Sequence, residues 1–354
     1  AHRLLYDWEQ VMHSLTERRA LLVGARVPAQ RYSDDEIALF EARWWRDWDG
    51  QILRAAMKRV LDGRAPTLHR LQMAVLALIV ADNQYQKRDA ERLAEVTVSI
   101  ETGTPREDTE KSKARLIFHT AFGDLDVALA AGTRLVEVER RSGNSASLWR
   151  ALRWISLPMR LLGDQPGAIS VLLEAYEQAA RLSLRGEMWN AAFYLQGVAL
   201  DCEDLNLALK WAPIVAELTP DATAHRLRTS EYHYTRARIE FMRGDFRRAR
   251  EHLEQARSLK TALSPARGEQ SLVALDVLLR VRAGEARIPR TLLGRLHRLH
   301  LATRDSGVWD FETAALVAGL LHSQKADDAL AVNSYYMRVR RSRIVSHPTL
   351  SAVQ

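Results

Sequence analysis

The sequence predicts an all-α protein, an α-solenoid of about eight helix hairpins that repeat with a period near 40 residues. Three observations predict it. Apolar residues recur at helical spacing, short polar breaks separate these apolar segments, and the alternation typical of strands is nearly absent. A single hairpin cannot bury its apolar face alone, so neighbouring hairpins must stack into an array.

The clearest copy of the repeat reads FMRGDFRRAREHLEQARSL. We expect one helix to end at Gly244 and the next to begin at Asp245, with Ala249, Leu253 and Ala256 marking its apolar face. The alanine that opens the second helix follows the glycine by five residues. The same order recurs in two other copies, as Gly163, Asp164 and Ala168 and as Gly123, Asp124 and Ala128.

The position of that alanine, which we call the slot, recurs with steps of 40, 38, 40, 40, 41, 40 and 40 residues. The residue five positions before the slot is also glycine at Gly284, but it is Tyr85, Glu203 or Gln324 in other copies and Trp45 in the first. This nearly constant spacing indicates a true repeat. The slots are Gly50, Ala90, Ala128, Ala168, Ala208, Ala249, Pro289 and Ala329.

Each repeat is interpreted as two antiparallel helices joined by a short loop. We expect an additional N-terminal capping helix over about 3–22, which divides the chain into a cap and linker at 1–32, the repeat array at 33–344 and a tail at 345–354. Pro158 is expected to kink its helix. The predicted pairs are 34–48 with 51–62, 67–82 with 87–100, 108–122 with 125–142, 146–162 with 166–182, 186–201 with 205–218, 223–243 with 246–261, 267–283 with 287–303, and 308–322 with 326–343.

These residues resemble tetratricopeptide repeats. Ala237, Gly244, Ala249 and Ala256 fit the small-residue positions of one copy, and Pro220 fits the closing proline of another. The period of about 40 instead of 34 is similar to that of the helical sensor domain of the bacterial maltose-regulon activator family. The resemblance implies a right-handed superhelix that binds a protein, peptide or small effector, with the first helix of each pair lining a concave groove.

The stretch EARWWRDWDG places Trp44, Trp45 and Trp48 on one face of the first predicted helix, which Ser33 and Glu36 begin as a capping box. Because this helix occupies the first-helix position of a repeat, we interpret the aromatic face as an enlarged contact between helices. The alternative is an exposed aromatic site for a ligand or a second subunit.

Composition favours a cytoplasmic protein. Cys202 is the single cysteine, which excludes an intrachain disulfide. The longest apolar segment is too short to span a bilayer, and the first residues, AHRLLYDWEQ, do not read as a signal peptide. The net charge is +7, and 44 of the 51 basic residues are arginine. This bias has two interpretations: recognition of phosphates or carboxylates, or the codon usage of a GC-rich bacterial genome.

No motif for catalysis is present: phosphate-binding glycine loops, HExxH and GxSxG are all missing. His297 and His300 share a helical face but have no evident third metal ligand nearby. Asp201 and Glu203 flank Cys202, and their charges should raise the pKa of its thiol. We therefore predict a protein that is not an enzyme and that needs no metal or other cofactor.

Helical phase selects candidate ligand-binding residues on three first helices. Arginines, an amide and tyrosines at these positions favour a carboxylate, an acidic peptide or a phosphorylated effector, whereas the alternative is a solvated helix face. Few acidic residues fall on this face, Glu231 being the clearest. The C-terminal run from Arg338 to Arg343 is either a solvated helix end or a contact to nucleic acid or a following domain. The candidates are Arg150, Arg153, Arg160, Asn190, Tyr194, Tyr234 and Arg238.

Two functions from different classes remain open. The first is the sensor or protein-interaction part of a bacterial signalling or transcription regulator, which binds a peptide, protein or small acidic effector. In that case nucleic acid is contacted only through an attached domain. The second is a stand-alone scaffold or chaperone-like adaptor for another protein. A membrane partner is expected in neither.

Overall fold

A computed structural model of the chain describes residues 13–18, 20–21, 51–63, 65–143, 145–220, 226–260, 266–303 and 310–343. The predicted helix over 34–48, with its three tryptophans and capping box, lies outside these residues, as does the tail at 345–354. Of the predicted capping helix over 3–22, residues 13–18 and 20–21 are described and are helical. None of the described helices combines the length with the apolar composition that a membrane span requires.

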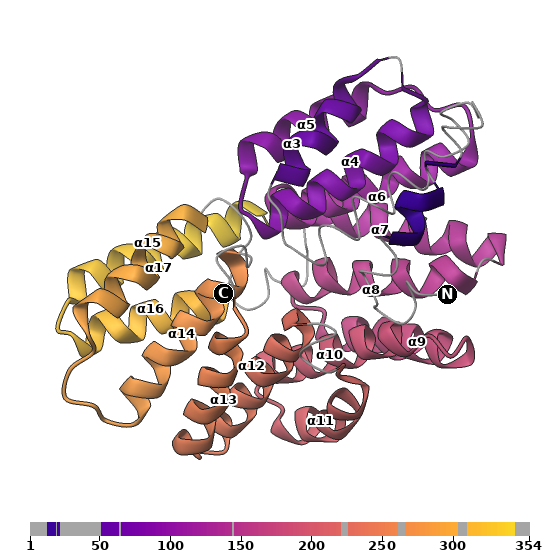
Figure 1. The fold of residues 1–354 in the computed structure, drawn as a ribbon. Coiled ribbons are helices and arrows are strands. Elements are labelled where there is room, and N and C mark those ends of the chain that lie inside the picture. Colours follow the sequence, from indigo (N-terminus) through magenta and orange to yellow (C-terminus); the bar gives the residue numbers. More distant parts are fainter. Residues whose placement is uncertain are drawn as a thin grey trace.

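Helices account for all the regular secondary structure of the described residues, which confirms the all-α prediction (Figure 1). Most observed boundaries fall within three residues of the predicted ones. The helices are α3 (Gln51–Leu61), α4 (Thr67–Asn83), α5 (Lys87–Ser99), α6 (Pro105–Phe122), α7 (Leu125–Ser142), α8 (Ser145–Leu161), α9 (Gln165–Arg181), α10 (Arg185–Asp201), α11 (Leu205–Leu218), α12 (Arg226–Met242), α13 (Phe246–Ser258), α14 (Ala266–Arg282), α15 (Arg290–Thr303), α16 (Asp310–His322) and α17 (Ala326–Arg343).

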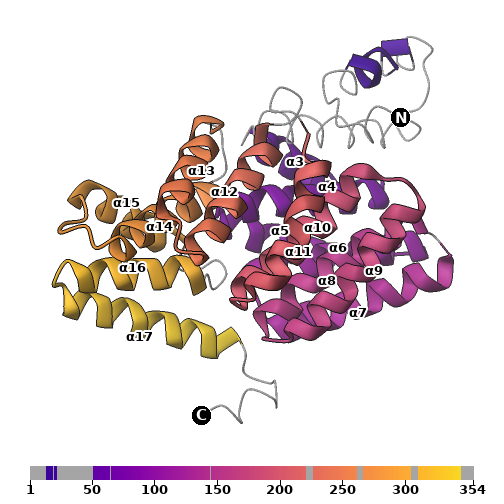
Figure 2. The same cartoon turned by 90° about the horizontal axis from the view of Figure 1, so that it is seen from below.

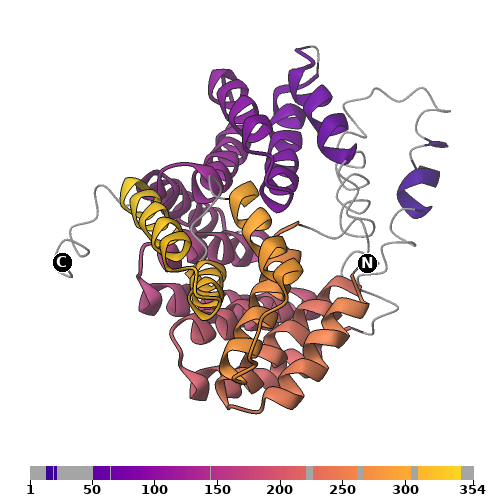
Figure 3. The ribbon, with the colours of Figure 1, turned by 90° about the vertical axis from the view of Figure 1, so that its left-hand side faces the viewer.

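The helices pair into hairpins, and the hairpins stack in chain order (Figure 3). Each first helix, from α4 through α14, packs against the next first helix, so α4 contacts α6 and α14 contacts α16. In the described chain, second helices contact the first helix of their own hairpin and the first helix of the next hairpin. They do not contact one another to a comparable extent, except for α3 and α5. Because the first helices are closer together, they form the inner row of a curved array, which confirms the solenoid of stacked hairpins.

In six of the described hairpins, the geometry of the turn explains the residue five positions before the slot; the exception is the turn between α6 and α7, where Gly123 has φ of −117°. A left-handed residue ends the first helix, and the next backbone N–H returns to a carbonyl five residues earlier, as between Asp204 N and Ala199 O at 2.9 Å. Glycine adopts this conformation at least cost, yet three copies use a larger residue. The left-handed residues at this position are Gly163, Gly244 and Gly284, with φ of 88°, 79° and 68°, and Tyr85, Glu203 and Gln324, with φ of 55°, 57° and 59°.

Aspartate begins the second helix of four hairpins. In each case the carboxylate accepts a hydrogen bond from a backbone N–H of the first helical turn, as from Leu207 N to Asp204 Oδ1 at 2.9 Å. The slot alanine is the fourth residue of the helix that follows, and it is fully buried because the two helices of the hairpin meet there. The capping aspartates are Asp124, Asp164, Asp204 and Asp245.

The predicted slot at Pro289 is wrong. Pro289 is exposed and precedes α15, so the fourth residue of that helix is Leu293, which is 6% exposed. A leucine needs more room than an alanine, and Gly319 of α16 provides it. A Cβ atom on Gly319 would lie 2.9 Å from Leu293 Cδ1 and 2.8 Å from Val277 Cγ1, closer than such atoms can pack.

Three contacts join hairpins that are distant along the chain. The Tyr85 hydroxyl, in the turn between α4 and α5, donates to Gln270 Oε1 of α14 at 3.1 Å. Leu227 of α12 packs against the N-terminal core formed by α3 to α6. Arg238 of α12 stacks on Phe311 of α16. The array therefore curves back until its inner row makes contacts across its interior, while α16 and α17 form one end of it (Figure 2).

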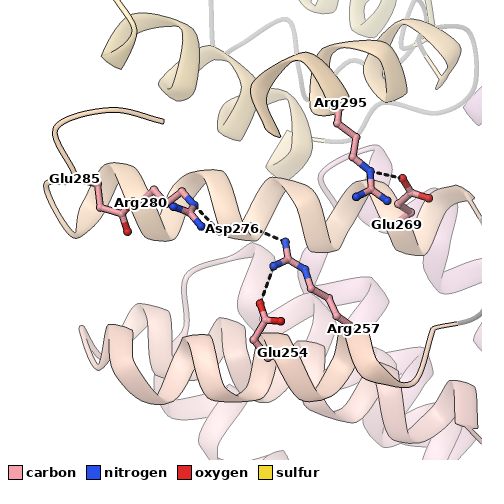
Figure 4. A network of polar contacts seen from close by, with 7 residues as sticks. All are labelled: Glu254, Arg257, Glu269, Asp276, Arg280, Glu285 and Arg295. Atoms are coloured by element: carbon pink, nitrogen blue, oxygen red, sulfur yellow. Dashed lines mark hydrogen bonds and ion pairs between the residues drawn. The ribbon is translucent and has the colours of Figure 1, made fainter. Parts of the chain in front are cut away.

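A polar network joins α13, α14 and α15 (Figure 4). Asp276, which is 7% exposed, accepts from Arg257 at 2.7 Å and from Arg280 at 2.8 Å. Arg257 also binds Glu254, and Arg280 also binds Glu285. Asp276 thus has both of its oxygens satisfied at the boundary between two hairpins.

Proline is tolerated within two of the helices. Pro158 lies inside α8 and Pro213 inside α11, and both helices continue past it. After Pro158 the helix continues, and Leu162 N donates to Pro158 O at 2.9 Å in the last turn. The expected kink at Pro158 stays a prediction.

Candidate functional site

All seven predicted site residues lie on first helices and therefore in the inner row. The structure places Arg160 and Arg238 in one cluster and Arg153 in another, and the two clusters differ in how well their charges are satisfied. Arg150, Arg153 and Arg160 lie on α8, Asn190 and Tyr194 on α10, and Tyr234 and Arg238 on α12.

The first cluster, which we call the Asp201 bridge, consists of Asp201, Arg160 and Arg238. Asp201 is the last residue of α10, and its two oxygens bind different arginines: Oδ2 accepts from Arg160 Nε at 3.0 Å and Oδ1 accepts from Arg238 Nη2 at 3.2 Å. The arginine side chains are only 19% and 12% exposed. Few acidic residues were expected on this face, with Glu231 the clearest; Asp201 is a further one, and its carboxylate compensates both arginines.

Arg238 is further held by aromatic rings. Its Cζ atom lies 4.5 Å from the centroid of Phe311 and 6.0 Å from that of Tyr234. Burial raises the pKa of the Tyr234 hydroxyl, so the tyrosine stays neutral. Arg238 therefore connects α10, α12 and α16, and it is a structural residue more than a free ligand-binding group.

A buried carboxyl adjoins this cluster. Glu312 of α16 is 6% exposed and accepts a hydrogen bond of 2.6 Å from the Ser271 hydroxyl. Burial raises the pKa of Glu312, with the Ser271 hydrogen bond and Arg238 acting in the opposite direction. The polar residues at the boundary of α12, α14 and α16 thus satisfy one another.

Arg153 differs from the arginines of the Asp201 bridge. Its Cζ atom lies 5.5 Å from the ring centroid of Tyr194, which orients the guanidinium over an aromatic face. Its Nε atom is buried without a hydrogen-bond partner, and no other hydrogen bond or ion pair joins the side chain to a described residue. A buried charged donor without an acceptor is costly, so Arg153 is suited to an acceptor supplied by a ligand.

Glu231 of α12 is the acidic residue that acts on Arg153. Burial raises the pKa of Glu231 to about 7, although Lys260, Arg228 and Arg153 all act to lower it. Glu231 itself makes no hydrogen bond or ion pair with another described residue. We call Glu231, Arg153, Arg228 and Lys260 the Glu231 cluster: three cations attract one carboxyl, and none of them is directly paired with it.

Arg228 is fixed in place within this cluster. It is 7% exposed, lies 4.5 Å above the Trp189 ring, and donates to Gly186 O at 3.0 Å and to Asn190 Oδ1 at 3.2 Å. Asn190 in turn donates to Glu187 Oε2 at 2.6 Å. The predicted residue Asn190 is therefore used to position Arg228.

Lys260 completes the Glu231 cluster, whereas Arg150 belongs to neither cluster. Lys260 follows α13, and burial lowers the pKa of its amine while Glu231 and Glu269 act to raise it. Arg150 is half-buried and lies 5.1 Å from the centroid of the neighbouring Trp149 ring.

Sequence reasoning missed Asp201, Arg228 and Lys260 as members of these clusters. Arg228 lies three residues before Glu231 on the same helix, so helical spacing contained a signal for it. Asp201 was interpreted only as a neighbour of Cys202. Lys260 lies in a loop, where periodicity places no side chain.

The other candidates for chemistry are satisfied locally. In the described part of the chain, no group of three or more histidine, cysteine, aspartate or glutamate residues could hold a metal ion. His300 is buried, and burial together with His297 lowers its pKa. The pKa of Cys202 is raised as predicted, but burial is the main cause, followed by Asp201. The side chains from Arg338 to Arg343 are not among those that the structure describes.

Comparison with known proteins supports the fold. The chain matches no protein-family model and no curated protein. It is similar to the solved structure of the apo form of the quorum sensor NprR from B. thuringiensis, with a TM-score of 0.52 and 11% sequence identity, and the match covers 95% of this chain and 97% of NprR. At this identity the likeness shows the fold alone, a tetratricopeptide-like array of helix hairpins. The closer relation to the maltose-regulon activator family stays a prediction.

Proposed function

We propose that the chain is a binding domain without catalytic activity, the sensor or protein-interaction part of a bacterial signalling or transcription regulator. Its ligand is an anion: an acidic peptide, an acidic segment of a protein or a small acidic effector. The proposal rests on the Glu231 cluster, and above all on Arg153, whose buried Nε has no acceptor among the described residues. Helical arrays of this type place binding surfaces on their inner row.

We propose a smaller set of ligand-binding residues than the sequence predicts. Arg153 and Tyr194 remain the central pair, because the tyrosine ring orients a guanidinium whose Nε–H donor lacks an acceptor among the described residues. Arg228 and Lys260 add positive charge beside them. Arg160 and Arg238 are already neutralised by Asp201, so we assign them to the scaffold of the site.

Titration calorimetry with N-acetyl-triaspartate tests this proposal, since the peptide has several carboxylates and no group that titrates near neutral pH. Arg153→Ala should weaken its binding about tenfold or more, because a charged hydrogen bond is lost. The control is Arg141→Ala, which removes an arginine that is 77% exposed on α7. Raising sodium chloride from about 50 to about 500 mM should weaken binding to the wild type. Equal affinity for the two variants would contradict the assignment.

A scaffold function remains the second candidate, because one end of the array exposes large apolar side chains. Leu321, Leu330 and Met337 of α16 and α17 are 55%, 66% and 40% exposed. A double variant, Leu321→Lys with Leu330→Lys, separates the two functions. It should leave affinity for N-acetyl-triaspartate unchanged if the Glu231 cluster is the binding site. If apolar docking is the function, the same variant should abolish covalent crosslinking to partner proteins.

A further inference from the structure

The Glu231 cluster has an internal anion that competes with any external one. Glu231 follows Arg228 by three residues on α12, and Arg228 and Arg153 contact Asn190 and Tyr194, which lie one turn apart on α10. Arg153, Arg228 and Lys260 each stabilise the charged form of Glu231. A ligand carboxylate that approaches the same cations would be repelled by an ionised Glu231. Both negative charges cannot be accommodated without cost, so one of them must be neutralised by a proton.

We propose that an anionic ligand binds to the Glu231 cluster together with one proton, which is taken up by the Glu231 carboxyl. This inference rests on the proposed function. The ligand carboxylate accepts hydrogen bonds from Arg153, and the neutral Glu231 carboxylic acid has an O–H group that can donate to the ligand instead of repelling it. The chemical class of ligand is thereby narrowed to anions that can accept this additional hydrogen bond.

Three structural observations support the inference beside the raised pKa of Glu231. Glu231 makes no direct ion pair with a described residue, so protonating it breaks no contact. Arg228 is held by Gly186 and Asn190, so its position does not depend on Glu231. Arg153 retains a buried donor without an acceptor. Protonation of Glu231 therefore leaves the cationic framework in place for a ligand.

The charged groups around Glu231 come from several elements. Arg153 acts from α8, Arg228 from α12 itself and Lys260 from the end of α13. On α14, Glu269 acts on Lys260 and is bound by Arg295 of α15 at 2.8 Å. From α10, Glu187 is joined to Arg228 through Asn190. The described residues of α11 add no charge to those that act on Glu231.

The proton changes the affinity in a defined direction. Burial holds the pKa of Glu231 at about 7 in the free protein, and a bound anion raises it further because ionisation would then place two negative charges together. Binding consequently takes up a proton above neutral pH, and affinity falls as the pH rises. For one proton with this pKa, affinity should fall about tenfold between about pH 6 and about pH 8.

The experiment is calorimetric titration of N-acetyl-triaspartate at about pH 6 and about pH 8. The wild type should show the tenfold loss, whereas Glu231→Gln, which is neutral at every pH, should bind at both pH values as tightly as the wild type does at the lower one. Glu177→Gln, at an exposed position on α9, is the matched control and should behave as the wild type. A second measurement needs no variant: in buffers of different ionisation enthalpy, the wild type should take up close to one proton at about pH 8.

The outcomes separate this inference from the proposed function. Binding that is independent of pH, or equally dependent on pH in the wild type and Glu231→Gln, overturns the proton-coupled mechanism alone. The absence of binding in both proteins at each pH overturns the proposed function and this inference with it. Proton uptake by the wild type that Glu231→Gln abolishes supports both.

Discussion

Arg238 of α12 donates a hydrogen bond of 3.2 Å to Asp201, the last residue of α10. Asp201 binds Arg160 of α8 with its other oxygen, so a single carboxylate joins three successive first helices of the array. Side chains of this kind, though they face the interior of the superhelix, contribute to stability and set the spacing of the inner row.

Asp201→Asn should lower the free energy of unfolding by about 1–2 kcal/mol, because it leaves two mostly buried guanidinium groups without a counter-ion. The Asp201 side chain is 27% exposed, so solvent reduces the effect below that of a fully buried pair. Urea unfolding followed by circular dichroism measures it. Glu177→Gln is the control, and equal stability of the two variants would show that the Asp201 bridge does not contribute to the free energy of unfolding.

Ala249→Arg should cost at least about 2 kcal/mol of unfolding free energy, because it inserts a long charged side chain where α12 and α13 meet. Ala249 is 0% exposed, as is Ala168 at the same position of its repeat. Thermal melts compared with those of Arg247→Ala, whose native side chain is 74% exposed on the same helix, test this. An unchanged melting temperature would mean that the slot does not lie at the helix contact.

Glu203→Gly should stabilise the protein by about 1 kcal/mol, because Glu203 holds a left-handed conformation with φ of 57° that glycine adopts without strain. The reciprocal change, Gly244→Gln, places a side chain at the equivalent turn and should destabilise by a similar amount. Differential scanning calorimetry of the two variants gives the signs. Shifts in the same direction would contradict the common turn geometry.

Stability should decrease as the pH falls below about 6.5, in part because of His233 and His252. Their Nδ1 atoms lie 3.2 Å apart on α12 and α13, and burial lowers the pKa of both imidazoles. A histidine whose pKa is lowered by folding binds a proton more readily in the unfolded chain, so its stabilising effect is present above the unfolded pKa and is lost upon acidification. His252 also interacts with Gln255, which has the opposite effect on its pKa.

Urea unfolding at about pH 7.5 and about pH 5.5 measures this dependence. The double variant His233→Gln with His252→Gln should lose less stability over that interval than the wild type does. An equal loss would assign the acid sensitivity to other groups.

The fold could be predicted from the sequence because each hairpin is specified locally. Gly163 and Asp164 mark a turn and a helix start, and Ala168 marks the close contact that follows. The prediction failed at Pro289, because constant spacing places the slot there whereas α15 begins only after this residue. The compensation between Leu293 and Gly319 brings together residues of different hairpins, which periodicity within one hairpin does not reveal.

The candidate site was predictable only in part, for a related reason. Helical phase places Arg153 and Tyr194 on one face, and the Arg153 Cζ atom lies 5.5 Å from the Tyr194 ring centroid. Phase does not report which charges meet across helices, so the pairing of Asp201 with Arg160 and Arg238 was missed. The curvature of the array decides those contacts, and it depends on the packing of all the hairpins together.

The most direct test of the proposed anion site is the nuclear magnetic resonance signal of the Arg153 Nε–Hε group, assigned by its loss in Arg153→Ala. The structure places this group in a buried position without an acceptor among the described residues. Addition of N-acetyl-triaspartate should shift its proton resonance downfield as a charge-assisted hydrogen bond forms, whereas the signal of Arg238, already bound to Asp201, should change little. An Arg153 signal that stays unchanged at concentrations that saturate binding, or the absence of any binding, would contradict the assignment of this site.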